Sequence, residues 1–179
     1  LDFGPVRKMV EFQIKNGIDG LFMGGLSTQT YLLTMEEKRR VGEELCNAAA
    51  GRVPVMMNVM EDSIKNAKQL VQDYMDIGVD AVCISQPSVF PYTEQALVEF
   101  FDEVIPEDYP TYIYNVPQTG NTMSPRTVAR IAVVRTDRRT AVRPAAMQVD
   151  RRTAARPAAV RTDRRTAARP AVVRTDGQG

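Results

Sequence analysis

Four short apolar runs, each flanked by segments whose apolar residues recur at helical spacing, organise residues 1–132. The runs lie at residues 20–23, 53–59, 81–84 and 111–114, and each has the length of a buried strand. Strands that alternate with helices favour parallel βα units. We therefore predict an α/β fold for this part of the chain. Both a barrel of repeated units and a doubly wound sheet give this alternation.

The predicted helices have recognisable starts and stops. Pro5 opens the first helix and Gly17 ends it, while Thr34 and Glu37 form a capping box for the second. The later helices are expected from Asp62 or Ser63 to Gly78, over residues 93–104, and from Ser124 until the pattern fades near Ala132. The helix that ends at Gly78 is predicted to bury Ile64, Ala67, Val71, and Tyr74 or Met75.

From about Val133 the sequence becomes a repeat rich in Arg, Ala and Pro. Asp137, Asp150, Asp163 and Asp176 are spaced 13 residues apart within it. The repeated prolines break helices, and the repeat lacks aromatic residues, so it cannot bury a core. We therefore predict two parts: a domain of residues 1–132 and a disordered low-complexity tail of residues 133–179.

The two parts have opposite charge. Residues 1–132 contain five Lys and six Arg against 18 acidic residues, a net charge of −7. Residues 133–179 contain 12 Arg and four Asp, a net charge of +8. One interpretation is that the acidic part is a passive body and the tail binds polyanions. The interpretation that we favour is that the tandem repeat is not a selected sequence.

The residue types in the chain argue against several kinds of binding site. Cys46 and Cys83 both lie in apolar surroundings, which favours buried free thiols over a disulfide. The chain has no histidine, so a zinc site is not expected, and no glycine-rich dinucleotide motif follows a predicted strand. We expect no metal and no cofactor. No apolar run approaches the length of a membrane helix, and the cytoplasm is the expected compartment.

Four stretches resemble the dihydrodipicolinate synthase and N-acetylneuraminate lyase family. They are residues 16–21 (Asn-Gly-Ile-Asp-Gly-Leu), 33–39 (Leu-Thr-Met-Glu-Glu-Lys-Arg), 50–55 (Ala-Gly-Arg-Val-Pro-Val) and 112–117 (Tyr-Ile-Tyr-Asn-Val-Pro). The resemblance covers about residues 1–132. It implies a (βα)8 TIM barrel, of which this chain carries about four βα units. It also implies a pyruvate-dependent Schiff-base lyase or aldolase that acts on keto acids and forms homo-oligomers.

The resemblance also implies roles for particular residues. Tyr114 matches the family's proton-shuttling tyrosine, and Gly25, Ser27 and Thr28 match the loop that binds the pyruvate carboxylate. The match is incomplete, because Leu26 stands where the family has a second hydroxyl. The alternative interpretation from the residues alone is that Tyr114 is a strand aromatic and that Ser27 and Thr28 are ordinary loop residues.

Other family features are absent. The resemblance implies an imine-forming lysine on a later strand, but the last lysine is Lys68. Lys8, Lys15, Lys38, Lys65 and Lys68 are all predicted on helices, on the outside of a barrel. The synthases' tyrosines and second-substrate arginine are also missing, at residues 87–90 and 117–120. We therefore expect a truncated relative that is inactive alone, derived from an enzyme with another aldehyde or keto-acid substrate.

Overall fold

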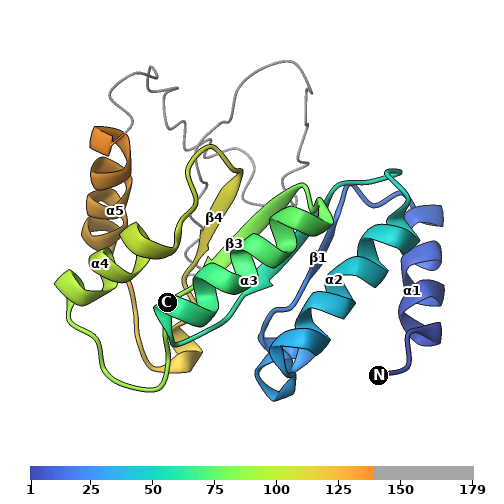
Figure 1. The fold of residues 1–179 in the computed structure, drawn as a ribbon, viewed down its shortest axis with the longest axis horizontal. Helices are drawn as coiled ribbons and strands as arrows, with labels where there is room; N and C mark the ends of the chain where they lie inside the picture. Colours follow the sequence, from blue (N-terminus) through green and yellow to red (C-terminus); the bar gives the residue numbers. More distant parts are fainter. Residues whose placement is uncertain (139–179) are drawn as a thin grey trace.

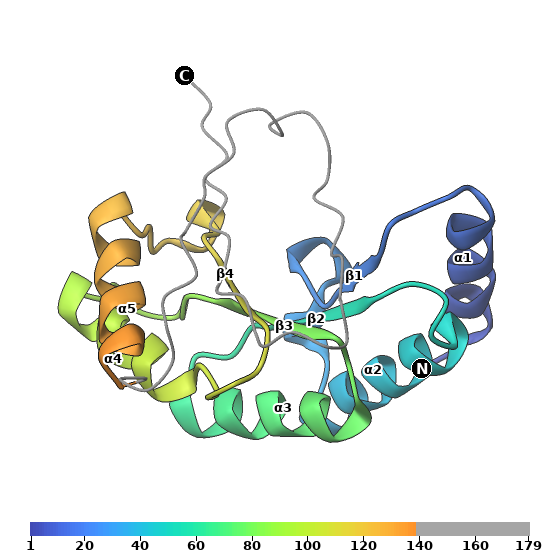
Figure 2. The same ribbon diagram turned by 90° about the horizontal axis from the view of Figure 1, so that it is seen from above.

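The computed structural model describes residues 1–138, which form an open arc of parallel strands with helices along its outer side (Figure 1, Figure 2). The strands are β1 (Leu21–Met23), β2 (Val55–Val59), β3 (Ala81–Ser85) and β4 (Thr111–Tyr114). The helices are α1 (Gly4–Lys15), α2 (Met35–Ala49), α3 (Ile64–Ile77), α4 (Glu94–Val104) and α5 (Pro125–Arg138). Three 3₁₀ turns, η1 (Leu26–Thr28), η2 (Thr30–Leu32) and η3 (Pro117–Thr119), follow β1 and β4.

The order of the strands decides between the two predicted folds. The sheet runs β1-β2-β3-β4, and every neighbouring pair is parallel. A doubly wound sheet reverses its strand order part-way, whereas a barrel adds each strand beside the last. The α/β prediction is therefore confirmed as a partial TIM barrel of four strands within the described residues.

The two faces of the sheet differ in chemistry. Side chains alternate between faces along a strand. On β2, Val55, Met57 and Val59 are buried in the core against the helices. The alternate residues of the four strands form the opposite face, which we call the inner face. It carries Phe22, Met56, Asn58, Cys83, Ser85, Tyr112 and Tyr114. One face of the sheet is therefore largely polar and aromatic, and the other packs against the helices in an aliphatic core.

Local signals placed most helix boundaries correctly. Thr34 and Glu37 form the predicted capping box, and Ser63 caps α3 by accepting from the Asn66 amide. Gly17 and Gly78, which follow α1 and α3, both have left-handed backbone conformations, with φ of 79° and 85°. Glycine adopts this conformation without the steric cost of a Cβ atom, which explains why α1 and α3 end at these two residues.

One boundary prediction and one burial prediction were wrong. Helix α5 does not fade near Ala132 but continues to Arg138, because no proline interrupts it and Val134 still packs on the core. It therefore includes the first residues assigned to the tail, although the division into domains at residue 132 stays a prediction. Ile64 is 40% exposed rather than buried, because it begins α3 at the surface; Leu70 is buried farther along the helix. The rest of the predicted tail lies outside the described residues.

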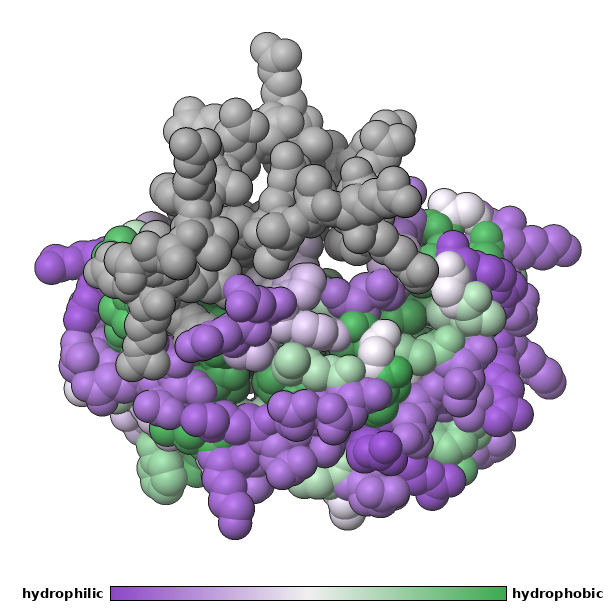
Figure 3. Space-filling view, turned by 45° about the horizontal axis from the view of Figure 1, so that its top comes forward, coloured by the Kyte–Doolittle hydropathy of each residue, from purple (hydrophilic) through white to green (hydrophobic). Residues whose placement is uncertain are grey.

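The lysines lie on helices as predicted, but one of them is not on the outside. Lys38 in α2 is only 6% exposed and forms an ion pair with Glu61, which follows β2. The other four are at the surface. Figure 3 shows mostly hydrophilic residues on the visible described surface, with smaller hydrophobic areas between them. Within residues 1–138, no helix is long and apolar enough to cross a membrane.

Candidate functional site

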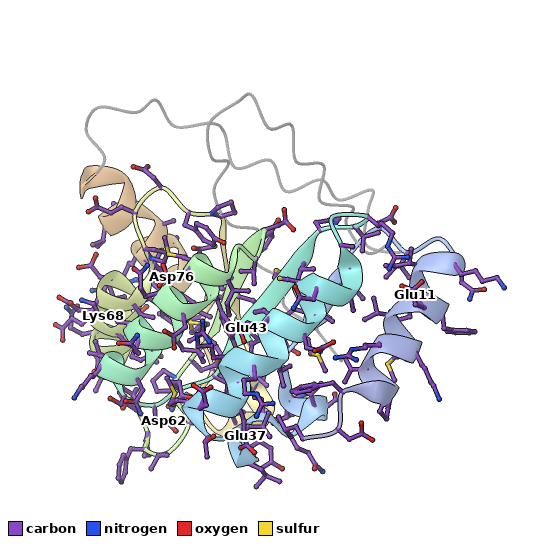
Figure 4. All side chains as sticks on the ribbon, turned by 45° about the vertical axis from the view of Figure 1, so that its right-hand side comes forward. Glu11, Glu37, Glu43, Asp62, Lys68 and Asp76 are labelled. Atoms are coloured by element: carbon purple, nitrogen blue, oxygen red, sulfur yellow. The ribbon has the colours of Figure 1, made fainter. Side chains whose placement is uncertain are left out.

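The loops that follow the four strands meet at one edge of the arc. Figure 4 shows Glu37 and Asp62 at this edge, where α2 and α3 begin, and Asp76 towards the far end of α3. In barrels built of βα units the active site lies at the carboxyl ends of the strands. Gly25, Ser27, Thr28 and Tyr114 all lie at or just after such strand ends. This edge is therefore the candidate site.

The loop after β1 is held tightly against β2. Gly24 has a φ of +87°, and a Cβ atom there would lie 3.0 Å from the carbonyl oxygen of Asn58. The Asn58 side chain donates from Nδ2 to the carbonyl oxygen of Gly24 over 3.1 Å. Only glycine permits both the backbone conformation and this close approach. The first residue of the loop is thus fixed in position by β2.

Phe22 connects the loop to the tyrosine. Its ring lies edge-on to that of Tyr114, with centroids 6.0 Å apart and an interplanar angle of 86°. The same ring lies against Gly25, where an added Cβ would be 3.3 Å from Cε1 of Phe22. Gly25 and Tyr114 therefore flank one aromatic ring. Sequence reasoning did not identify Phe22, although an alternating pattern starting from Leu21 would have placed it on the inner face.

Ser27 and Thr28 follow on the same loop in η1, and both are exposed. The Thr28 hydroxyl donates to the Gly25 carbonyl oxygen over 2.7 Å, so it closes the 3₁₀ turn. Ser27 carries the hydroxyl that stays at the surface of the loop. The structure thus places Gly25 and Tyr114 against the same Phe22 ring. The hydroxyl-bearing residues Ser27 and Thr28 lie on the exposed turn of the loop.

A polar chain crosses the inner face below these residues. Ser85 Oγ hydrogen-bonds Asn58 Oδ1 over 3.2 Å, and Asn58 in turn holds Gly24. The chain thus links the residue after β1 to β2 and β3, and Ser85 is the register partner of Tyr114 on β4. Asn58 and Ser85 are each only 1% exposed, and their polar groups satisfy one another. Sequence reasoning missed both residues, because Asn58 lies within a methionine-rich strand that indicated barrel filling.

Three buried amides tie together the loops after β3 and β4. Gln86 donates to the Asn121 carbonyl oxygen over 2.7 Å and accepts from the Val116 amide over 3.1 Å. Asn115 both donates to and accepts from the backbone of Met123. Asn121 donates to the Pro87 carbonyl oxygen. Because each amide has partners for its donor and its acceptor, the network fixes the chain that follows Tyr114.

Burial favours the neutral forms of two ionisable groups on the inner face, Cys83 and Tyr112. Burial raises the pKa of the Cys83 thiol to about 12, so the thiolate is negligible near neutral pH. Burial, with a smaller contribution from Cys83, also raises the pKa of Tyr112. Both cysteines are free thiols, as predicted, but only Cys83 is buried, whereas Cys46 is partly exposed. Within residues 1–138, no cluster of His, Cys, Asp or Glu side chains is arranged to hold a metal ion.

Comparison with known proteins identifies the family. The model of the dihydrodipicolinate synthetase family matches residues 1–158. The 4-hydroxy-tetrahydrodipicolinate synthase of Pelobacter propionicus is 34% identical over 134 residues, which is 74% of this chain and 46% of that protein. The synthase of Jannaschia sp. is 29% identical over 133 residues, again 46% of its length. The chain thus spans about half the length of these relatives.

Solved structures agree with this result. YagE from E. coli K12, a prophage protein of the dihydrodipicolinic acid synthase family in complex with pyruvate, has a TM-score of 0.71 at 26% identity. That match covers 76% of this chain and 47% of YagE. The Acinetobacter baumannii dihydrodipicolinate synthase complexed with pyruvate has a TM-score of 0.69 at 28% identity, covering 74% of this chain and 46% of that one. This chain belongs to the dihydrodipicolinate synthetase family.

Proposed function

We propose that this chain carries the keto-acid-binding part of a pyruvate-dependent lyase site. The loop of Gly25, Ser27 and Thr28 binds the keto-acid carboxylate, and Tyr114 is the proton-transfer residue. The observation that carries the proposal is the Phe22 ring, which lies against both Gly25 and Tyr114 at the strand-end edge. Two relatives of known structure are complexes with pyruvate, which supports a keto acid as the ligand.

The chemistry of the edge suits a small carboxylate. Gly25 brings its backbone close to the Phe22 ring, and Ser27 presents a hydroxyl donor. The neutral Cys83 and the buried Asn58 and Ser85 add no negative charge to the inner face that would repel an anion. Tyr114 is half-buried beside an aromatic ring, where its hydroxyl is still able to meet a bound ligand.

We further propose that this chain alone forms no Schiff base. Imine formation needs a neutral amine that points into the site. Lys38 in α2 is only 6% exposed, and its amine is engaged in an ion pair with Glu61, which follows β2. Lys8, Lys15, Lys65 and Lys68 are on the outer helices. The keto acid is therefore held without covalent attachment.

The test is borohydride trapping with pyruvate, followed by intact-mass spectrometry. The expected result is an unchanged mass for this chain. The Acinetobacter baumannii synthase, treated in parallel, is the positive control, and we expect its mass to increase. A pyruvate adduct on this chain contradicts the proposal, and the Lys38→Met variant then shows whether Lys38 is the amine that reacts.

A further inference from the structure

The hydroxyl of Tyr74 in α3 is buried without a protein partner. Tyr74 is 0% exposed, and within residues 1–138 no group hydrogen-bonds its hydroxyl. A buried hydroxyl that makes no hydrogen bond is destabilising, so nearly all such groups in proteins bind either another protein group or an ordered water molecule. The surroundings of this hydroxyl therefore indicate what it binds.

The ring of Tyr74 lies against α2 at Gly42. A Cβ atom at Gly42 would be 3.2 Å from Cδ1 and 3.1 Å from Cε1 of the ring. Side chains of a helix lean towards its N-terminus, so Tyr74 leans towards the start of α3. Figure 4 shows Asp62, which comes just before that start, at the strand-end edge of the arc. The hydroxyl is thus directed between α2 and α3 towards this edge.

The buried ion pair of Lys38 and Glu61 lies in the same direction. Lys38 comes one helical turn before Gly42 in α2, so these two residues share a face of the helix. Glu61 is in the loop between β2 and α3. Burial raises the pKa of Tyr74, and the negative charge of Glu61 raises it further. The Tyr74 hydroxyl is therefore within electrostatic reach of the ion pair, between α2, α3 and the loop after β2.

The three polar groups complement one another as hydrogen-bonding partners. Lys38 Nζ carries three N–H donors, and Glu61 accepts one of them through Oε1. A carboxylate accepts at both oxygens, and a tyrosine hydroxyl both donates and accepts. The side chains of Lys38 and Glu61 are only 7% and 11% exposed. A small ligand between the three groups would be nearly enclosed and would meet both donors and acceptors.

The charges of the ion pair select a neutral ligand. Lys38 and Glu61 together carry no net charge, and a metal ion would be repelled by the amine, whereas an anion would be repelled by the carboxylate. A water molecule is neutral and has two donors and two acceptors. Buried water molecules in proteins make about three hydrogen bonds, which matches the three groups of this cluster.

We propose that a single buried water molecule binds between α2, α3 and the loop after β2, where it joins the Tyr74 hydroxyl to the ion pair of Lys38 and Glu61. The water accepts from Lys38 Nζ and from the Tyr74 hydroxyl, and it donates to the Glu61 carboxylate. The Tyr74 hydroxyl thereby gains a partner. The proposal does not depend on keto-acid binding, because none of the three residues belongs to the inner face of the sheet.

The water site also supports the loops at the strand-end edge. Glu61 is followed by Asp62, whose carboxylate accepts from the backbone amides of Ser88 and Val89 and from the Ser88 hydroxyl. Because the water holds Glu61 to both α2 and α3, it also limits the movement of Asp62. The water is thus a structural ligand that connects the packing of two helices to the loop after β3.

The first test is the Tyr74→Phe variant of the full 179-residue chain. If the hydroxyl binds water, its removal loses a hydrogen bond, and we expect the equilibrium constant for unfolding to rise at least about threefold. If the hydroxyl has no partner, phenylalanine removes the cost of burying it, and the variant becomes more stable. Urea unfolding followed by circular dichroism distinguishes the two results, and a gain in stability overturns the proposal.

Two other tyrosines provide matched controls. Tyr109 donates directly to the Val79 carbonyl oxygen, so Tyr109→Phe should lose stability through a hydrogen bond that involves no water. Tyr31 is 56% exposed, so Tyr31→Phe should change the stability little. An effect of Tyr74→Phe no larger than that of Tyr31→Phe counts against the water site.

The ion pair is tested as the other half of the site. Lys38→Met combined with Glu61→Leu removes both charged partners and keeps the side chains similar in volume, a change that folded proteins often tolerate. In this background we expect the effect of Tyr74→Phe on the unfolding constant to fall below about twofold, because the water has lost its other partners. The effect of Tyr109→Phe should be unchanged. Equal effects of Tyr74→Phe in the two backgrounds contradict the proposal.

A crystal structure of the unmodified chain tests the site directly. We expect one water molecule at hydrogen-bonding distance, about 2.7–3.2 Å, from Tyr74 Oη, Lys38 Nζ and a carboxylate oxygen of Glu61. A direct hydrogen bond between Tyr74 and Glu61, or no water between the three groups, overturns the proposal even if the stability measurements agree with it.

Discussion

The ring of Phe22 on β1 meets the ring of Tyr114 on β4 edge-on, with centroids 6.0 Å apart, although two strands lie between them. Neighbouring strands are about 4.8 Å apart, so three spacings separate β1 and β4 by about 14 Å in a flat sheet. The two rings meet because the sheet curls towards its inner face. The contact therefore reflects barrel-like curvature of the sheet, and it places Tyr114 beside the ring that also lies against Gly25.

The first prediction concerns this contact. In a double-mutant cycle of Phe22→Leu and Tyr114→Leu, we expect a coupling energy of about 0.5–1.5 kcal/mol, as for other edge-to-face aromatic pairs. Urea unfolding followed by circular dichroism measures it. The control cycle combines Phe22→Leu with Tyr31→Leu, since Tyr31 is an exposed tyrosine in η2, and it should show no coupling. Equal coupling in the two cycles contradicts the contact.

The second prediction concerns the buried ion pair of Lys38 and Glu61. Lys38→Met leaves the Glu61 carboxylate buried without a partner, so the free energy of unfolding should fall by about 3–5 kcal/mol. Adding Glu61→Gln should restore much of this loss. Lys68→Met is the matched control: its pair with Glu103 is about half exposed, and the expected loss is below about 1 kcal/mol. Equal losses for the two lysines contradict the burial of Lys38.

The third prediction concerns Gly42 in the middle of α2. A Cβ atom there would lie 3.1 Å from Cε1 of Tyr74, whose ring is fully buried and has no room to move. Gly42→Ala should therefore destabilise the chain, although alanine alone favours a helix by about 1 kcal/mol. In a Tyr74→Leu background the same substitution should stabilise it. Thermal unfolding of the four proteins gives the result, and the same sign in both backgrounds contradicts the packing.

The fourth prediction concerns pH. Burial raises the pKa of Cys83 to about 12, so between about pH 9 and pH 12 the folded chain keeps a proton that the unfolded chain loses. The stability that the protonated Cys83 thiol contributes is present in full below pH 9. Above pH 9 the free energy of unfolding falls by up to about 1.4 kcal/mol per pH unit. A Cys83→Ala variant should lose stability less steeply over this range. Parallel slopes for the two proteins contradict the burial of the thiol.

Local signals in the sequence predicted the helix boundaries better than they predicted the contacts between helices and strands. Pro5, Gly17, Thr34 and Gly78 act within a few residues of themselves, and the helix boundaries that they predict agree with the structure. Strand order was open from sequence, because alternation of helix and strand does not fix which strands are neighbours. The run of residues 133–138 looked like the start of the repeat, but its place in α5 depends on packing of Val134.

The candidate site was only partly predictable for the same reason. Tyr114 and Gly25 were found because the family resemblance marks them. Phe22, Asn58 and Ser85 act through contacts between strands that are distant in sequence, so no local pattern identified them. Lys38 was expected at the surface because it was predicted on a helix, on the outside of a barrel. Its burial accompanies an ion pair with Glu61, which is 23 residues away in the sequence, so no local pattern predicted it.

We propose that this chain holds a keto acid at the strand-end edge between the Gly25 loop and Tyr114. The most direct test is a titration of the isotope-labelled chain with pyruvate, followed by nuclear magnetic resonance of the backbone amides. We expect saturable shifts at Gly25, Ser27, Thr28 and Tyr114, with the amides of α3 unchanged. An absence of shifts at millimolar pyruvate, or shifts confined to other parts of the chain, contradicts it.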